Sequence, residues 1–349
     1  MVFQTASVGS SLTTEYTTIS AEVDDYLFLY PLLSTQCQGN TCNPASRPQA
    51  WAKNIVSVGG IYHQGTADRC DDHWNDPEGC GSTGPAADGR IKPDLAFFFD
   101  GIRAAAPASD TAYTEFGGTS AATAMTAGHF GLLFQMWHEG VWPGHGGGTD
   151  VFDSRPQMAT AKALMINMAY RYSWTSPGGC AYSDVDRFVQ GWGTADVRRL
   201  YERAPVTSIV DETYALAPQE TKLYRVLVEP RQSELNVTLV YTDPMGTVGA
   251  DYARINDLSL QVIPPSGTAY WGNYGLEAGN VSVPGGNSDT VNTVENVFIP
   301  APQAGTWTVA VIGDEIVEDA HLETPELDAD YALVVSGGLI KWKVEIEPE

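Results

Sequence analysis

The chain has 349 residues, 35 glycines, 21 prolines and a formal net charge of −24 at pH 7. This length favours two domains, and the 10% of aromatic residues supplies material for packed cores, so a disordered or fibrous chain is excluded. The negative charge excludes nucleic acid as a partner, since phosphate contacts need clustered Lys and Arg, and no apolar run approaches the roughly 20 residues of a membrane span.

Short apolar runs alternate with helical patterns in the first part of the chain, which is typical of a parallel α/β sheet. A helix is predicted over residues 20–30 and another over 157–170. Residues 118–137 predict a long, almost wholly apolar helix, which we expect in the core because it has no polar face for water. Strands are predicted at 2–7, 31–35 and 54–58.

The pattern changes after about residue 205. Apolar and polar residues now alternate in short runs separated by turn signals such as Pro265-Ser-Gly, which indicates an antiparallel β-sandwich or jelly roll. We therefore predict an α/β domain over residues 1–205 and a β-sandwich domain over 206–349. The predicted strands are 222–228, 235–241, 258–263, 294–299, 307–312 and 331–335.

A serine stands where a glycine-rich turn enters the long apolar helix, in Phe116-Gly-Gly-Thr-Ser120. The free N–H groups and the dipole of a helix N-terminus favour negative charge developing beside such a hydroxyl. Taken alone, Gly-Thr-Ser is more often an ordinary helix cap. The surrounding sequence decides between the two interpretations.

Four further segments occur in a fixed order around this serine. Their sequences are Ser46–Gly59 (Ser-Arg-Pro-Gln-Ala-Trp-Ala-Lys-Asn-Ile-Val-Ser-Val-Gly), Gly84–Asp94 (Gly-Pro-Ala-Ala-Asp-Gly-Arg-Ile-Lys-Pro-Asp), Ala161–Asn167 (Ala-Lys-Ala-Leu-Met-Ile-Asn) and Gln190–Gly193 (Gln-Gly-Trp-Gly). Together with Ser120 they resemble the subtilisin-like serine protease family (peptidase S8). The resemblance covers nearly all of residues 1–205 and implies a serine endopeptidase that acts on polypeptides.

The resemblance assigns roles to individual residues. Ser120 matches the nucleophile, and Asn40 in Cys37-Gln-Gly-Asn40 matches the oxyanion-hole asparagine, although Cys37 and Gln38 replace two small residues of the family motif. A turn-forming asparagine is the alternative for Asn40. The predicted substrate-binding residues are Ser7, Val8, Gly9, Gln38, Gly39, Gly118 and Thr119.

Four motifs after residue 205 extend the resemblance. They are Leu239-Val-Tyr-Thr-Asp-Pro, Ile255-Asn-Asp-Leu-Ser-Leu, Asn292-Thr-Val-Glu-Asn-Val-Phe-Ile and Gln303-Ala-Gly-Thr-Trp-Thr-Val. They resemble the jelly-roll domain of an alkaline-protease branch of the same family, which implies an extracellular protein, although the N-terminus shows no signal peptide.

The family's aspartate strand and its His-Gly-Thr-His helix have no counterpart here, so we expect an N-terminally incomplete protease without useful activity as this chain alone. Three explanations compete for the missing segments: an incomplete reading frame of a full protease, half of a split enzyme completed by an N-terminal fragment on another chain, and a non-catalytic peptide- or surface-binding protein. Of the six histidines, only His73 is retained as a substitute base; His129 lies about 13 Å along the helix from Ser120.

The cysteines and the acidic residues suggest further sites. Disulfides are predicted for Cys70 with Cys80 and for Cys37 with Cys42, with free thiols as the alternative. The chemistry requires no cofactor, but structural calcium is a possible addition. The candidate ligands are Asp68, Asp71, Asp72, Asp76 and Glu78 in one group and Asp243, Asp251, Asn256 and Asp257 in the other; a solvated acidic loop is the alternative for the first group.

Overall fold

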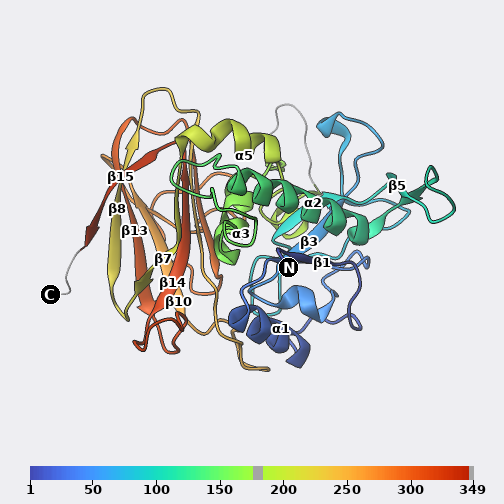
Figure 1. Cartoon of the computed structure of the whole chain (residues 1–349), viewed down its shortest axis with the longest axis horizontal. Coiled ribbons are helices and arrows are strands. Elements are labelled where there is room, and N and C mark those ends of the chain that lie inside the picture. Colours follow the sequence, from blue (N-terminus) through green and yellow to red (C-terminus); the bar gives the residue numbers. More distant parts are fainter. Residues whose placement is uncertain (176–183, 346–349) are drawn as a thin grey trace.

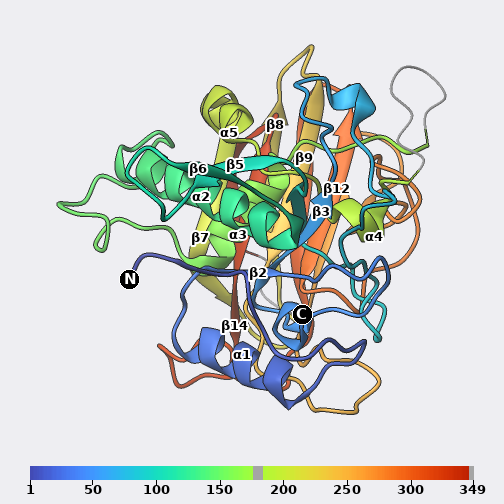
Figure 2. The ribbon, with the colours of Figure 1, turned by 90° about the vertical axis from the view of Figure 1, so that its right-hand side faces the viewer.

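The computed structural model describes residues 1–175 and 184–345. A parallel α/β part and a β-sandwich lie side by side, with α3 (Met158–Asn167) between α2 (Gly118–His138) and the sandwich (Figure 1). α3 packs on one sheet of the sandwich, whereas α2 packs on the parallel sheet of the α/β part; a view turned by 90° shows both helices in front of the sandwich (Figure 2). The mixed α/β and antiparallel architecture confirms the predicted fold class.

The α/β part contains a four-stranded, fully parallel sheet in the order β1-β2-β3-β4. β2 and β3 are buried along their whole length, as expected for parallel strands covered on both faces. The strands are β1 (Gln4–Ala6), β2 (Ser34–Cys37), β3 (Val56–Ile61) and β4 (Leu95–Phe98), with α1 (Thr18–Leu29) between the first two.

Helix α2 packs on this sheet, but only part of the prediction that it lies in the core is confirmed. Phe130, Leu133 and Phe134 are buried, whereas Leu132 is 48% exposed. The apolar composition was therefore misleading, because small or apolar side chains also occupy the outer face of the helix. The remaining helical segments are η1 (Pro48–Trp51), η2 (Arg69–Asp71), α4 (Arg187–Gln190), α5 (Val197–Arg203) and η3 (Ala204–Val206).

The sandwich consists of two antiparallel sheets, in the orders β11-β10-β13-β8-β15 and β12-β9-β14-β7. Leu260, Val309 and Val226 from the first sheet and Val237 and Leu333 from the second belong to one buried core. The strands are β7 (Thr207–Leu216), β8 (Thr221–Val228), β9 (Glu234–Val240), β10 (Asp257–Ile263), β11 (Tyr270–Trp271), β12 (Val294–Pro300), β13 (Gly305–Glu315), β14 (Ala329–Ser336) and β15 (Leu339–Glu345).

The second sheet is covered on its other face by α3. Asn167 donates from its side-chain amide to the Thr238 hydroxyl at 3.0 Å and to the Val334 carbonyl at 3.2 Å. β9 is consequently buried on both faces, while β8 alternates between buried and half-buried residues. Polar residues of β9, such as Thr238, therefore face α3 rather than water.

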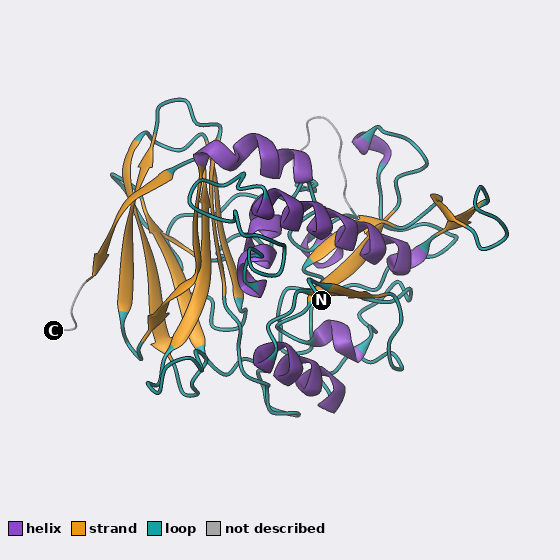
Figure 3. Cartoon of the chain, in the orientation of Figure 1, coloured by secondary structure: helices purple, strands orange, loops and turns teal. Residues whose placement is uncertain are grey.

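Each predicted strand has a counterpart, displaced by a few residues at most. The sequence interpretation missed β4, β7, β11, β15 and a hairpin formed by β5 (Ile102–Ala105) and β6 (Tyr113–Phe116). This hairpin projects from the side opposite the sandwich (Figure 3), and all of β6 is exposed, so no buried apolar face marks it in the sequence. In the described part of the chain, no helix combines the length and apolarity needed to cross a membrane.

Candidate active site

Ser120 is the third residue of α2 and follows the N-cap Gly117, Gly118 and Thr119. The Gly118 N–H donates to the Phe99 carbonyl at 2.6 Å, which ties the helix start to the end of β4. Gly118 has φ +80°, and a Cβ at this position would lie 2.9 Å from the side-chain nitrogen of Asn40. Glycine is therefore required both by the backbone conformation and by the close approach of Asn40.

The side chain of Asn40 is oriented by Thr119. Its Oδ1 accepts from the Thr119 N–H at 3.0 Å and lies 2.9 Å from the Thr119 hydroxyl. The Thr119 side chain also contacts the Gly39 N–H and carbonyl, each at 3.2 Å. Because the Asn40 oxygen is held in this way, the amide nitrogen is the donor that remains for a ligand at the helix N-terminus.

Ser7 lies on the other side of the nucleophile position. The Ser120 hydroxyl donates to the Ser7 carbonyl at 3.1 Å, and the Ser7 hydroxyl donates to the Ser120 carbonyl at 2.9 Å. The next residue, Val8, is 76% exposed, and its carbonyl accepts from the Gln36 side chain at 3.0 Å. The Gly9 carbonyl accepts from Arg47 at 3.2 Å.

The structure thus brings Ser7, Gly39, Asn40, Gly118, Thr119 and Ser120 together. Gln38 differs from the others, because its side chain is fully buried and its amide has no hydrogen-bond partner among the described residues. Only Val8, Gly9 and Asn40 of the predicted substrate-binding and oxyanion residues are openly exposed. The sequence interpretation did not predict the hydrogen bonds from Thr119 that orient Asn40, because they join a helix start to a loop 79 residues away in the sequence.

No histidine in the described residues is hydrogen-bonded to Ser120. His73, the retained candidate base, instead lies 3.2 Å from Asp76 and stacks on Tyr62. Burial opposes its charging, but the hydrogen bonds to Asp71 and Asp76 raise the pKa of His73 above its ordinary value. The other five contact Asp100 (His63), Met125 (His129), Ser154 (His138), Trp137 (His145) and Asp328 (His321).

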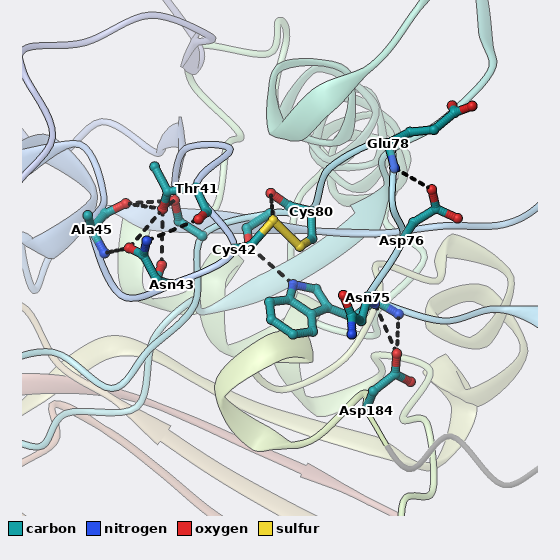
Figure 4. The surroundings of a disulfide bond; sticks show 12 residues. Thr41, Cys42, Asn43, Ala45, Asn75, Asp76, Glu78, Cys80 and Asp184 are labelled. Carbon is teal, nitrogen blue, oxygen red and sulfur yellow. Dashed lines mark hydrogen bonds between the residues drawn. A yellow bond between two sulfur atoms is a disulfide. The ribbon is translucent and has the colours of Figure 1, made fainter.

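Both predicted disulfides are wrong. Cys42 is bonded to Cys80 (Figure 4). Cys37 is a buried free thiol whose pKa is raised by burial. Cys70 is disulfide-bonded as well, but not to Cys80, because the Cys80 sulfur is bonded to Cys42. The predicted pairs joined cysteines that are close in the sequence, whereas the loop after Asn40 folds against residues 80–82 and brings Cys42 to Cys80. Cys180 lies outside the described residues.

The disulfide anchors the loop that carries Asn40. Two residues after Asn40, Cys42 is linked to Cys80, and the neighbouring Thr41 and Ser82 hydroxyls are 2.8 Å apart. Both hydroxyls also donate to the Ala45 carbonyl, at 2.9 and 2.7 Å. The candidate oxyanion donor is therefore attached to a covalently cross-linked turn, which the position of Cys42 in the sequence could have suggested.

The first predicted calcium group is dispersed over separate contacts. Asp68 accepts from the Cys70 N–H, Asp71 from the Thr66 hydroxyl and Asp72 from the buried Tyr172 hydroxyl. Asp76 bonds His73 and the Glu78 N–H. Within residues 1–175 and 184–345, no three His, Cys, Asp or Glu side chains are arranged to hold a metal ion.

In the second predicted calcium group, the Asp243 carboxylate is already paired with an ammonium group. The Lys53 Nζ is 2.6 Å from Asp243 Oδ2, 2.5 Å from the Pro244 carbonyl and 2.7 Å from the Ala253 carbonyl, and Lys53 and Asp243 are fully buried. Asn256 caps the N–H groups of residues 317 and 318. Asp257 lies 3.6 Å from Arg254, and Asp251 is exposed.

Comparison with known proteins supports the resemblance. A sequence profile described as "Subtilase family" matches residues 8–193. The Dictyostelium discoideum protein "Serine protease/ABC transporter B family protein tagB" is 24% identical over 335 residues, covering 79% of this chain and 17% of its own length. Its counterpart tagA is 24% identical over 270 residues, covering 67% and 14%. The chain spans less than a fifth of these curated relatives.

Among solved structures, the prenylagaramide maturation protease PagA has a TM-score of 0.41 and 16% identity, covering 58% of this chain and 60% of its own. The PatG macrocyclase in complex with peptide has a TM-score of 0.41 and 15% identity, covering 57% and 50%. The subtilase profile matches more than half of the residues, and the chain therefore belongs to the subtilase family.

Proposed function

We propose that the chain carries the nucleophile and the oxyanion donor of a subtilisin-like serine endopeptidase that is secreted and cleaves polypeptides. The observation that supports this best is the position of Ser120 in the first turn of α2, next to an Asn40 amide whose oxygen is held by Thr119. Free N–H groups of a first helical turn and a side-chain amide are suitable donors for a tetrahedral oxyanion.

In the proposed reaction, the Ser120 Oγ attacks the peptide carbonyl carbon while its proton passes to a general base. The oxyanion that forms accepts from the Asn40 amide and the Ser120 N–H. Collapse of this intermediate breaks the C–N bond, the base returns the proton to the leaving amine, and water then hydrolyses the Ser120 ester. Val8 and Gly9, which are exposed, would lie beside the extended substrate.

The base is the part of the proposal that these residues do not supply. In the described structure the Ser120 proton is directed at the Ser7 carbonyl, which cannot accept it during attack. We propose that a histidine from a segment additional to residues 1–349, on the same or another polypeptide, completes the site. No cofactor takes part in this chemistry.

A fluorophosphonate probe tests the nucleophile directly, because it modifies only an activated serine. We expect little labelling of the chain alone and faster labelling of Ser120 when imidazole supplies a diffusible base, with Ser120→Ala as the blank. Asn40→Ala should slow labelling by about 100- to 1,000-fold, which is the cost of losing one such donor in subtilisin itself. Asn40→Asp keeps the acceptor for Thr119 but lacks the donor, and should be similarly slow.

Failure of imidazole to promote labelling at Ser120 would contradict the proposed nucleophile. It would favour the second candidate, a non-catalytic peptide-binding protein, which the Ser120–Ser7 contact without a histidine also permits.

The strand order of the sandwich supports the further proposal of a jelly roll like that of the alkaline-protease branch. The boundary near residue 205 and an extracellular location stay predictions.

A further inference from the structure

Three arginines surround one carboxylate where the α/β part meets the sandwich. Glu234, at the start of β9, lies 2.6 Å from Arg199, 3.3 Å from Arg203 and 3.4 Å from Arg171. Arg199 and Arg203 belong to α5, whereas Arg171 follows α3 and stacks on the Phe298 ring at 3.9 Å. We call Arg171, Arg199 and Arg203 the arginine cluster.

The arginine cluster has two more positive charges than Glu234 can balance. Nearby acidic residues are otherwise engaged: Asp196 caps the N-terminus of α5, and Glu202 pairs with Arg198 at 2.7 Å. In the described part of the chain, no carboxylate other than Glu234 lies within ion-pair distance of the cluster. This excess of positive charge stands out in a protein whose net charge is −24.

The hydrogen bonds of the cluster are also incomplete. The Arg171 Nη1 and the Nε atoms of Arg199 and Arg203 are buried without a partner among the described residues. Arg171 reaches Glu234 and Asn236 only at 3.4 Å, which is long for a charged hydrogen bond. Burial, together with repulsion from the other two arginines, lowers the pKa of Arg171 to about 10. Buried cations normally have full sets of acceptors.

A glycine in a neighbouring turn lets the backbone pass close to Glu234 and Arg203. Gly337, in the turn between β14 and β15, has φ +83°, and a Cβ there would lie 1.9 Å from the Glu234 carbonyl and 3.0 Å from Arg203 Nη2. The site is nevertheless open to solvent, because the side chains of Arg199 and Glu234 are 29% and 21% exposed. A small ion can therefore reach guanidinium groups whose positions the fold has already set.

We propose that the arginine cluster binds a tetrahedral dianion of the sulfate or phosphate type. Two negative charges balance the excess on the cluster, and planar guanidinium forks match the oxygen pairs of such ions. The bound anion would link α5, through Arg199 and Arg203, to the segment after α3 that carries Arg171. The proposal concerns a site separate from Ser120 and does not depend on peptidase activity.

Thermal unfolding of the 349-residue chain at constant ionic strength tests the site, with sodium chloride exchanged stepwise for sodium sulfate or phosphate. A bound ion stabilises the folded state by RT ln(1 + [ion]/Kd), so Tm rises with the logarithm of the ion concentration once that concentration exceeds Kd. Arg199→Gln should weaken the apparent Kd at least tenfold. Arg198→Gln is the matched control, because Arg198 is on the same helix and highly exposed but pairs only with Glu202, and it should bind like the wild type.

Sulfate also stabilises proteins by exclusion from their surfaces, and this effect raises Tm equally in all variants. A rise in Tm that is as large in Arg199→Gln as in the wild type and Arg198→Gln would overturn the proposal. Arg203→Gln provides a second test if Arg199→Gln does not fold. An additional arm with phenyl phosphate distinguishes the sources: tighter binding than inorganic phosphate indicates a phosphoryl group on a partner, and equal binding indicates the free ion.

Discussion

Ser7 and Ser120 hold each other through two hydrogen bonds, one in each direction. The Ser120 hydroxyl donates to the Ser7 carbonyl, and the Ser7 hydroxyl donates to the Ser120 carbonyl. The segment after β1 is thereby fastened to the first turn of α2, although 113 residues separate the two serines. The nucleophile position and the exposed Val8–Gly9 edge form one unit.

Replacing Ser7 by alanine should lower the free energy of unfolding by about 1 kcal/mol. Only the bond from the Ser7 hydroxyl is lost, since the Ser120 hydroxyl donates to a backbone carbonyl that alanine retains. Urea unfolding measures the change. Ser11→Ala, at an exposed position, is the control, and equal stability of the two variants would contradict the role of the Ser7 hydroxyl.

Two glycines of α2 should respond to alanine with opposite signs. Gly118→Ala places a Cβ at φ +80° against Asn40, so we expect a loss of about 1 to 2 kcal/mol or more. Gly128 is exposed within the helix with open space around its Cβ position, and Gly128→Ala should add up to about 1 kcal/mol. Chemical unfolding of both variants is the measurement; a gain for Gly118→Ala would show that the turn is not as described.

Removing the Cys42–Cys80 disulfide should destabilise the chain by roughly 3 to 4 kcal/mol, because it closes a loop between residues 38 positions apart. The double variant Cys42→Ser, Cys80→Ser is compared with the wild type in urea. Buried Cys37 should react with a thiol reagent only after unfolding. A non-reducing digest that yields Cys70 linked to Cys80 would contradict the pairing.

Asp257 should make stability fall as pH rises from about 4 to 6. Burial, and repulsion by Asp314 and Asp289, raise the pKa of Asp257 to about 6, so the folded state holds a proton that the unfolded chain releases at its ordinary value near 3.8. The unfolded state therefore binds fewer protons in this window, and stability decreases with pH.

Asp257→Asn removes this ionisation. The difference in Tm between this variant and the wild type should therefore be more positive at pH 7.5 than at pH 4.5. The corresponding gain in the free energy of unfolding is at most roughly 3 kcal/mol, because the pKa of Asp257 is raised by about two. Asp251→Asn, at an exposed position, should show no such pH dependence. A Tm difference between Asp257→Asn and the wild type that stays constant from pH 4.5 to 7.5 would be evidence against a protonated Asp257.

The candidate site was predictable to the extent that it depends on a local motif. Gly118 and Ser120 mark a turn into a helix, and the family resemblance identified Asn40 as the partner of that turn. Thr119 was assigned to substrate binding, whereas the structure shows it holding Asn40. Such a bond depends on the relative placement of two loops, which local patterns do not encode.

The sequence by itself determined the two kinds of architecture, the helix that begins at Gly118, most of the strands and the place of Ser120 at the start of that helix, because periodicity and turn residues act over a few neighbours. Only the tertiary structure decided which cysteine pairs with Cys80, that the Lys53 ammonium lies where Asp243 had suggested calcium, and that three arginines converge on Glu234. These contacts join charged groups and thiols that are far apart in the sequence, and only the packing of the sheets and helices brings them within a few ångströms of each other.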